Sequence, residues 1–123
     1  MSQAELKPRN TIKSSDLYEV LQYTCSLTFV REILFKFGYF IHDHVAPMAQ
    51  LNVKGKPRIH PSASLRCGYN IHVGYNSHIN QFCCIWASKN AKIYLGDNLL
   101  MGPGVRIFSS NHSIFETSIP MNV

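Results

Sequence analysis

The chain has 123 residues, which is enough for one domain with a single core. Its composition, 46% hydrophobic and 15% charged, argues against a disordered or fibrous protein. The formal net charge is +5, and the basic excess lies in residues 51–123, where seven Lys or Arg face two acidic residues. The first residues are polar and of mixed charge, without the apolar segment of a signal peptide, so we expect a cytoplasmic location.

The first region with a regular pattern is helical. Asp16 can cap a helix, and Glu19 three residues later can reach back to form a capping box. Apolar residues then recur every three or four positions, and Gly38 is the expected C-terminal stop. Ser and Thr weaken the helix propensity between Cys25 and Thr28. The sequence therefore predicts either one long helix or two helices with a break at this point.

Charged residues interrupt this helical segment too often for a membrane-spanning helix. A helix lying on a membrane surface stays open, because Arg31 and Lys36 flank a Phe-rich face. The alternative is that the apolar face packs on the rest of the chain or on a neighbouring subunit. We assign residues 1–50 to a helical segment with a linker and residues 51–123 to a second domain.

The second half carries a repeat. Large aliphatic residues recur every six positions, at Val73, Ile79, Ile85 and again at Leu95, Met101 and Ile107. A helix repeats its apolar face every 3.6 residues and a strand every 2, whereas a hexapeptide period is typical of a parallel β-helix. Each hexapeptide makes a short strand and a turn, so about eighteen residues complete one circuit. The aliphatic residues are expected to point into the core, with Gly, Asn and Asp at the corners.

Two stretches depart from this rhythm. The first repeat-like units begin at Ile59 and Leu65, two residues out of phase with the later ones, so we expect an irregular first circuit. The residues from Trp86 to Asn90 do not continue the period, which resumes at Ile93. The sequence therefore predicts a corner loop after Ile85.

The run from Ile71 to His112 resembles the hexapeptide-repeat sugar O-acetyltransferases of galactoside, maltose or polysaccharide type. The matching segments are VGYNSHIN at residues 73–80, IYLGDNLLMGPGVRI at residues 93–107, and the pair Asn111 and His112. The resemblance implies a mainly β fold, a left-handed parallel β-helix with an N-terminal α-helical segment. It further implies a homotrimer that uses acetyl-CoA as co-substrate, binds no cofactor and acetylates a sugar or polysaccharide acceptor.

The resemblance also implies roles for particular residues. His112 would be the general base, since a sugar hydroxyl must lose its proton as it attacks the thioester and imidazole titrates near the working pH. Asn80 would bind the acceptor, although a corner Asn in a left-handed turn is an equal alternative. Trp86 could stack on a sugar face or simply pack, and Asn111 stands beside the base. The family's acidic acceptor ligand is replaced by Ala87 and Ser88, which leaves the acceptor's identity open.

Other site types have weaker signals. His60 and His78 are eighteen residues apart, as in a zinc site of a β-helical carbonic anhydrase, but a third His at matching spacing is missing and we predict no metal site. The four Cys have neither zinc nor disulfide spacing and are expected to be free thiols, with Cys83 facing inward and Cys84 outward. The basic residues of the repeats fit either an anionic ligand such as coenzyme A or a solvated surface.

The resembled enzymes continue well beyond the catalytic His, with further repeats that hold acetyl-CoA. We therefore expect residues 51–123 to be an incomplete, C-terminally truncated repeat domain with weak or no activity and an unknown cofactor-binding set. The alternative function is non-enzymatic, as a truncated remnant or an assembly scaffold. No nucleic-acid partner is predicted.

Overall fold

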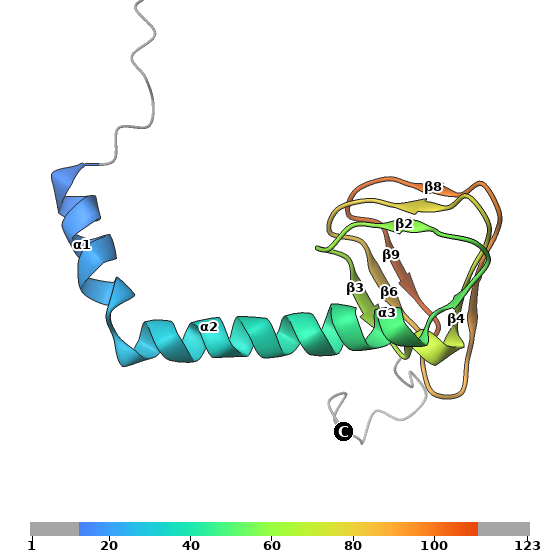
Figure 1. Cartoon of the computed structure of the whole chain (residues 1–123), viewed down its shortest axis with the longest axis horizontal. Coiled ribbons are helices and arrows are strands. Elements are labelled where there is room, and N and C mark those ends of the chain that lie inside the picture. Colours follow the sequence, from blue (N-terminus) through green and yellow to red (C-terminus); the bar gives the residue numbers. More distant parts are fainter. Residues whose placement is uncertain (1–12, 111–123) are drawn as a thin grey trace, which may run out of the picture. The chain divides into compact units, whose positions relative to one another are not determined.

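The computed structural model describes residues 13–110 (Figure 1). The chain forms two compact units, Met1–Phe37 and Gly38–Val123. We call the described parts of these units the helical unit and the sheet unit. The domain division that the sequence predicted at residue 50 stays a prediction.

The helical segment consists of two helices, α1 (Ser14–Thr24) and α2 (Leu27–Phe40). Ser26 makes the break between them: its hydroxyl donates to the carbonyl of Tyr23 (2.6 Å) and accepts from the amide of Phe29 (3.1 Å). The same side chain thus ends the first helix and begins the second. Of the two alternatives that the sequence left open, two helices with a break is confirmed.

Both predicted helix ends need correction. Asp16 does not cap α1 but lies in its first turn, where its carboxylate accepts the amide of Lys13 (3.3 Å). Gly38 does not stop α2, which ends at Phe40 and continues through the π-helical turn η1 (Ile41–Val45) into α3 (Ala46–Gln50). A Gly within a helix only weakens it. Pro47, which cannot donate a helical hydrogen bond, follows closely on the π-helical turn η1.

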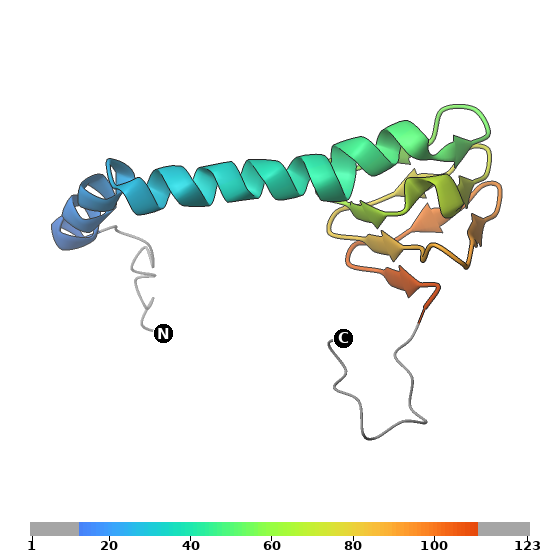
Figure 2. The ribbon, with the colours of Figure 1, turned by 90° about the horizontal axis from the view of Figure 1, so that it is seen from below.

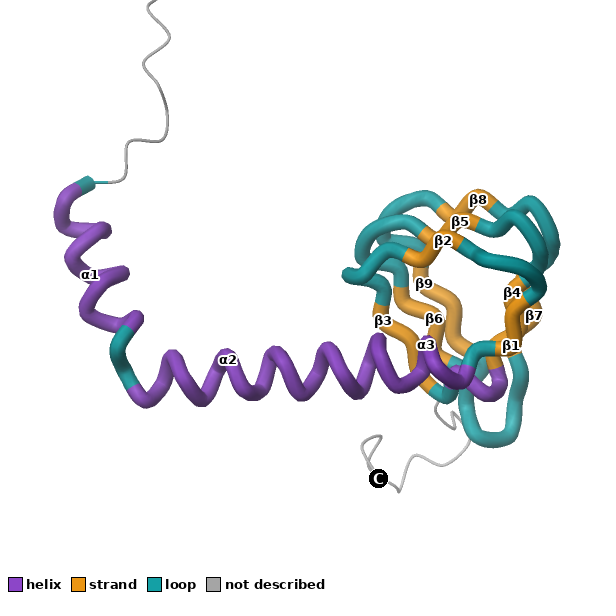
Figure 3. Tube along the Cα trace, in the orientation of Figure 1, coloured by secondary structure: helices purple, strands orange, loops and turns teal. Residues whose placement is uncertain are grey.

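The remainder of the sheet unit, as far as it is described, is built from short strands. These are β1 (Asn52–Val53), β2 (Arg58–Ile59), β3 (Ser64–Arg66), β4 (Ile71–Val73), β5 (His78–Ile79), β6 (Cys84–Trp86), β7 (Ile93–Leu95), β8 (Leu100–Met101) and β9 (Arg106–Phe108), with the 3-10 turn η2 (Gly68–Asn70) before β4. Every third strand pairs in parallel, which gives sheets β1-β4-β7, β2-β5-β8 and β3-β6-β9. Consecutive strands therefore lie in different sheets, placed on three sides of a common core (Figure 3).

The predicted circuit of about eighteen residues is too short. Asn52 pairs with His72, 20 residues later, and Ile71 pairs with Ile93, 22 residues later. The additional residues lie at corners, in η2 and in the loop between Trp86 and Ile93. The corner loop expected after β6 is thus confirmed, and it lengthens the later circuit.

The residues at the six-residue spacing do form the core. Most of the buried apolar side chains come from these positions and their inward neighbours: Ala63, Leu65, Ile71, Val73, Ile79, Cys83, Ile85, Ala87, Ile93 and Met101. Cys83 is buried and Cys84 partly exposed, as predicted, and all four cysteines are free. The spacing therefore located the interior of the sheet unit correctly.

The corners use Asn as predicted, whereas the repeat glycines Gly74, Gly96 and Gly102 do not have the positive φ expected of them. Asn76 and Asn98 adopt positive φ (53° and 54°), and their side chains are hydrogen-bonded to each other at 2.9 Å. Gly74 has no such φ; it is needed because a Cβ there would lie 2.4 Å from the carbonyl carbon of Gly96. Here a glycine permits two circuits to approach each other, and asparagine supplies the turn.

The predicted fold class, a mainly β protein forming a left-handed parallel β-helix, is wrong. Helix accounts for 39% of the described residues and strand for only 23%, and the strands form three small parallel sheets of three strands each. The continuous helical run from Leu27 to Gln50 is longer than the sequence indicated, and two or three residues per strand leave most of each circuit in turns. The described chain is therefore a helix-rich mixed protein.

Helical residues cover one end of the stacked strands within the sheet unit. Pro47 is buried, Met48 packs against the core, and the ring Nδ1 of His44 lies 2.7 Å from the carbonyl oxygen of Ala63. Figure 2 shows α3 at this end of the stack and β9 at the other. The segment from η1 to α3 thus positions its polar side chains against β3.

Candidate functional site

The predicted general base lies beyond the part of the chain that can be described. His112 and its neighbour Asn111 are outside residues 13–110. The backbone leading to them is fixed at Ser109, whose hydroxyl accepts the amide of Ser88 (2.8 Å) and donates to the carbonyl of Ala91 (2.9 Å). These hydrogen bonds connect the corner loop to Ser109. Ser109 is three residues before the predicted base in the sequence.

Asn80, the predicted acceptor-binding residue, follows β5 and links two circuits. Its side-chain amide donates to the carbonyl of Met101 (2.9 Å), which also accepts the backbone N–H of Asn80 (3.3 Å). Its φ is not positive, so the alternative of a left-handed corner does not apply; Phe82 takes that conformation instead. The Asn80 side chain is thus held in place by one hydrogen bond from its amide group to the neighbouring circuit.

Trp86 is packed among side chains of β3 and β9. Its indole N–H donates to the hydroxyl of Ser64 (2.9 Å), and the guanidinium carbon of Arg66 lies 3.8 Å from its ring centroid. Phe108 meets the ring edge-on at 5.3 Å. One face of the indole is therefore covered by Arg66, which favours the packing interpretation over sugar stacking there. Asn80 follows the central strand of one sheet and Trp86 lies in the central strand of another, and they make no hydrogen bond to each other.

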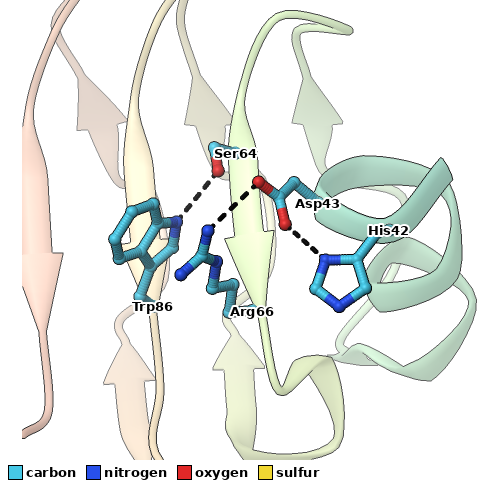
Figure 4. A network of polar contacts seen from close by, with 5 residues as sticks. All are labelled: His42, Asp43, Ser64, Arg66 and Trp86. Carbon is cyan, nitrogen blue, oxygen red and sulfur yellow. Dashed lines mark hydrogen bonds and ion pairs between the residues drawn. The ribbon is translucent and has the colours of Figure 1, made fainter. Parts of the chain in front are cut away.

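The most connected polar cluster joins η1 to β3, and sequence analysis did not single it out (Figure 4). Asp43 is the centre: one carboxylate oxygen lies 2.6 Å from Nδ1 of His42, and the other accepts from Nη2 of Arg66 (3.4 Å). The Asp43 side chain is 19% exposed, whereas His42 is 75% exposed. A carboxylate therefore orients an imidazole whose other ring nitrogen, Nε2, faces away from that hydrogen bond.

The electrostatics of Asp43 follow from these contacts. Burial by itself would raise the pKa of the carboxyl group, because it disfavours the charged form. The hydrogen bonds and positive charges of His42 and Arg66 outweigh burial, and the pKa of Asp43 lies below its ordinary value. Asp43 is thus ionised at neutral pH and acts as the anchor of the cluster.

A pocket of about 280 Å³ lies beside this cluster. It is lined by His42, Ala46, Pro47, Gln50, Arg66, Cys67 and Tyr69. The Cys67 thiol, through its hydrogen bond to Tyr69, raises the pKa of that phenol. The pocket could admit a small polar molecule beside an oriented imidazole. The only sequence signal was the run His42-Asp43-His44, and nothing in it pointed to Arg66, which is 23 residues from Asp43.

The geometry required for the zinc alternative is not formed. His78 stands opposite Arg58 in one neighbouring strand and Leu100 in the other, while Nδ1 of His60 lies 2.8 Å from the Ser62 hydroxyl. The two imidazoles therefore do not stack one circuit apart. Within residues 13–110, no three His, Cys, Asp or Glu side chains are grouped as metal ligands.

Comparisons with known proteins give no match among protein-family models, curated proteins or solved structures. Among the helices described, none has both the length and the apolar character needed to cross a membrane.

Proposed function

We propose that the chain transfers an acetyl group from acetyl-CoA to a hydroxyl of a sugar or surface polysaccharide, acting in the cytoplasm as a homotrimer. His112 is the general base, and Asn80, Trp86 and Asn111 contribute to the acceptor site. This proposal rests on the resemblance of residues 71–112 to hexapeptide-repeat sugar O-acetyltransferases.

The observation that supports it best is the anchored end of β9. Ser109 is held by the backbone of Ser88 and Ala91, so the chain leaves the sheets at a fixed point three residues before His112. An imidazole that removes a proton from an attacking hydroxyl must be placed within hydrogen-bond reach of it. A fixed approach to His112 lowers the cost of that placement.

The two described site residues, Asn80 and Trp86, are not equally suited to bind the acceptor. The amide of Asn80 is oriented by Met101, which leaves its side-chain oxygen to accept a hydrogen bond from an acceptor hydroxyl. Trp86 offers only the face and edge not taken by Arg66 and Phe108. We therefore expect Asn80 to matter more than Trp86 for acceptor binding.

The test is transfer of radiolabelled acetyl from acetyl-CoA to a panel of sugars and polysaccharides by the full chain. His112→Ala should lower the rate about 10²–10⁴-fold, the usual contribution of a general base. His42→Ala is the matched control, because it removes an exposed imidazole from the other candidate cluster and should leave the rate unchanged. An unchanged rate in His112→Ala, or a loss confined to His42→Ala, contradicts the assignment.

A non-enzymatic assembly scaffold is the second candidate. It is favoured by the separation of Asn80 and Trp86 and by the many exposed apolar side chains of the helices. A chain that binds neither acetyl-CoA nor sugars, yet forms a stable oligomer, would support the scaffold and exclude the transferase.

A further inference from the structure

The helical unit exposes nearly all of its apolar side chains. In residues 13–37 every residue is exposed except Ser26, which is half-buried. The large exposed apolar residues are Leu17, Tyr18, Val20, Leu21, Tyr23, Leu27, Phe29, Val30, Ile33, Leu34, Phe35 and Phe37. Monomeric proteins rarely leave a continuous apolar surface of this extent, which usually marks an interaction site. An amphipathic helix normally turns its apolar face toward a core or another buried surface.

The two helices form an open groove at their bend. Residues of both helices line a hollow of about 470 Å³: Val20, Tyr23, Thr24, Ser26, Thr28, Phe29 and Glu32. A second hollow shares Val20 and Tyr23 and continues along α1 past Glu19 to Asp16. Asp16, Val20 and Tyr23 share one face of α1 by their helical spacing, as do Phe29 and Lys36 on α2. The groove is thus lined by two aromatic residues, Tyr23 and Phe29, and by three acidic ones, Asp16, Glu19 and Glu32.

The two helices carry net charges of opposite sign. Helix α1 carries Asp16 and Glu19 and no basic residue, whereas α2 carries Arg31 and Lys36 against Glu32. If α1 of one molecule lies antiparallel on α2 of another, Asp16 meets Lys36 at one end and Tyr23 meets Phe29 near the bend. In the same register Val20 lies opposite Glu32 between these two contacts. The helical unit as a whole has three basic and three acidic residues between positions 13 and 37, so it has no net charge to attract an anionic membrane.

We propose that the helical unit pairs with the same unit of a second copy of this chain, α1 of each copy lying antiparallel on α2 of the other. A twofold axis then passes by the bend, as expected for an interface between identical surfaces. The aromatic residues at the bend form the centre of the contact, and the Asp16–Lys36 pairs fix the direction and register of the helices. The pairing is independent of the proposed acetyl transfer.

Cys25 is the one exposed cysteine among the four, but it does not line the groove. Its spacing of seven from Tyr18 places it on the side of α1 away from Asp16 and Val20. A disulfide through Cys25 would therefore not report the pairing, and Cys25 is replaced by Ser in the disulfide test. Diamide, which takes up the hydrogens of two thiols, then links only cysteines introduced at the proposed contact, and absence of that link overturns the pairing.

The register is tested with cysteines placed on the Cys25→Ser background. A mixture of Asp16→Cys and Lys36→Cys chains should form a mixed disulfide under diamide. Tyr18→Cys is the control, since Tyr18 is equally exposed but lies on the opposite side of α1 from Asp16 and Val20. Linking of Tyr18→Cys as efficient as that of the Asp16–Lys36 mixture contradicts the proposed faces.

The mass of the full chain in solution completes the test. Sedimentation should give an even number of copies: two, or six if the sheet units also form the proposed trimer. Phe29→Asp should halve that mass, because it places a charge in the aromatic centre, whereas Leu34→Asp on the side away from the groove should not. A monomer or a trimer overturns the pairing, as does Phe29-dependent binding to phosphatidylcholine vesicles without any disulfide-linked dimer.

Discussion

The two units of the chain use the same apolar residue types in opposite ways. In the sheet unit, Leu65 and Ile85 are 0% exposed, whereas Leu27 and Leu34 in the helical unit are 90% and 66% exposed. A spacing of six brings side chains from every circuit to one interior, so the sheet unit buries its own core. Within residues 13–37 the helices satisfy their backbone hydrogen bonds internally but bury none of their large apolar side chains. The sheet unit is thus stabilised by its own core, whereas the helical unit as described has no core of its own.

The largest difference between the two units is expected when one large apolar side chain is truncated in each. Ile85→Ala removes atoms from a fully buried site and should lower the free energy of unfolding by about 2–5 kcal/mol. Leu34→Ala removes an exposed side chain and should change it by less than about 0.5 kcal/mol at concentrations too low for association. Urea unfolding followed by the fluorescence of the single Trp measures both. Equal losses would show that the helices are stabilised as the sheets are.

The next largest effect concerns how closely the circuits of the sheet unit approach. Gly74→Ala would place a Cβ 2.4 Å from the carbonyl carbon of Gly96, and relieving that clash should cost about 1–3 kcal/mol. Gly96→Ala is the matched control, because nothing lies within 4 Å of the Cβ it would add. The two midpoints in urea should differ clearly. A harmless Gly74→Ala would mean that the circuits can separate without losing the core.

The periodicity of the sequence explains why the interior of the sheet unit was predictable. Burial imposes a residue type at each inward position, so Val73, Ile79 and Ile85 could be identified without coordinates. The circuit length could not, because the corners tolerate η2 and the loop before Ile93 without disturbing the inward positions. Local signals likewise allowed a break between Cys25 and Thr28, which the structure has at Ser26. They misjudged Gly38, where the context of a long helix outweighs the cost of one glycine.

The candidate site was less predictable than the core. Asp43 and Arg66 meet only because η1 lies against β3, and a contact between residues 23 positions apart has no local signature. The aromatic and amide residues chosen from the resemblance, Trp86 and Asn80, prove to be hydrogen-bonded within the stack. The local sequence determines which side chains could bind a ligand. Tertiary packing determines which of them already make hydrogen bonds within the protein.

The contact of Asp43 with Arg66 tests how firmly the helical end of the sheet unit is attached. The pKa of Asp43 is lowered in the folded state, so the unfolded chain binds more protons at acidic pH. The stabilisation is present above the ordinary Asp pKa of about 4 and is lost as the pH falls through the lower, folded-state value. Because Arg66 is 42% exposed, screening limits the effect to about 1 kcal/mol.

Asp43→Asn should therefore lower stability at pH 7 and converge with the parent chain in strong acid. Unfolding followed by Trp fluorescence across that pH range measures the difference. Glu32→Gln is the control, because it removes the same charge from an exposed pair with Arg31 on α2 and should not shift the unfolding of the sheet unit. Parallel pH curves for the parent chain and Asp43→Asn would contradict the role assigned to Asp43.

The smallest expected effect concerns the stacking of Arg66 on Trp86. Arg66→Lys keeps the charge beside Asp43 but loses the planar guanidinium that lies 3.8 Å from the indole centroid, which should cost about 0.5–1 kcal/mol. The Trp86 emission should shift to longer wavelength as water reaches the exposed ring face. Arg106→Lys on β9 is the control, since Arg106 is exposed and makes no ion pair within the described residues. If Arg66→Lys alters neither stability nor emission, the indole is held by Ser64 and Phe108 alone, and its second face stays available to a ligand.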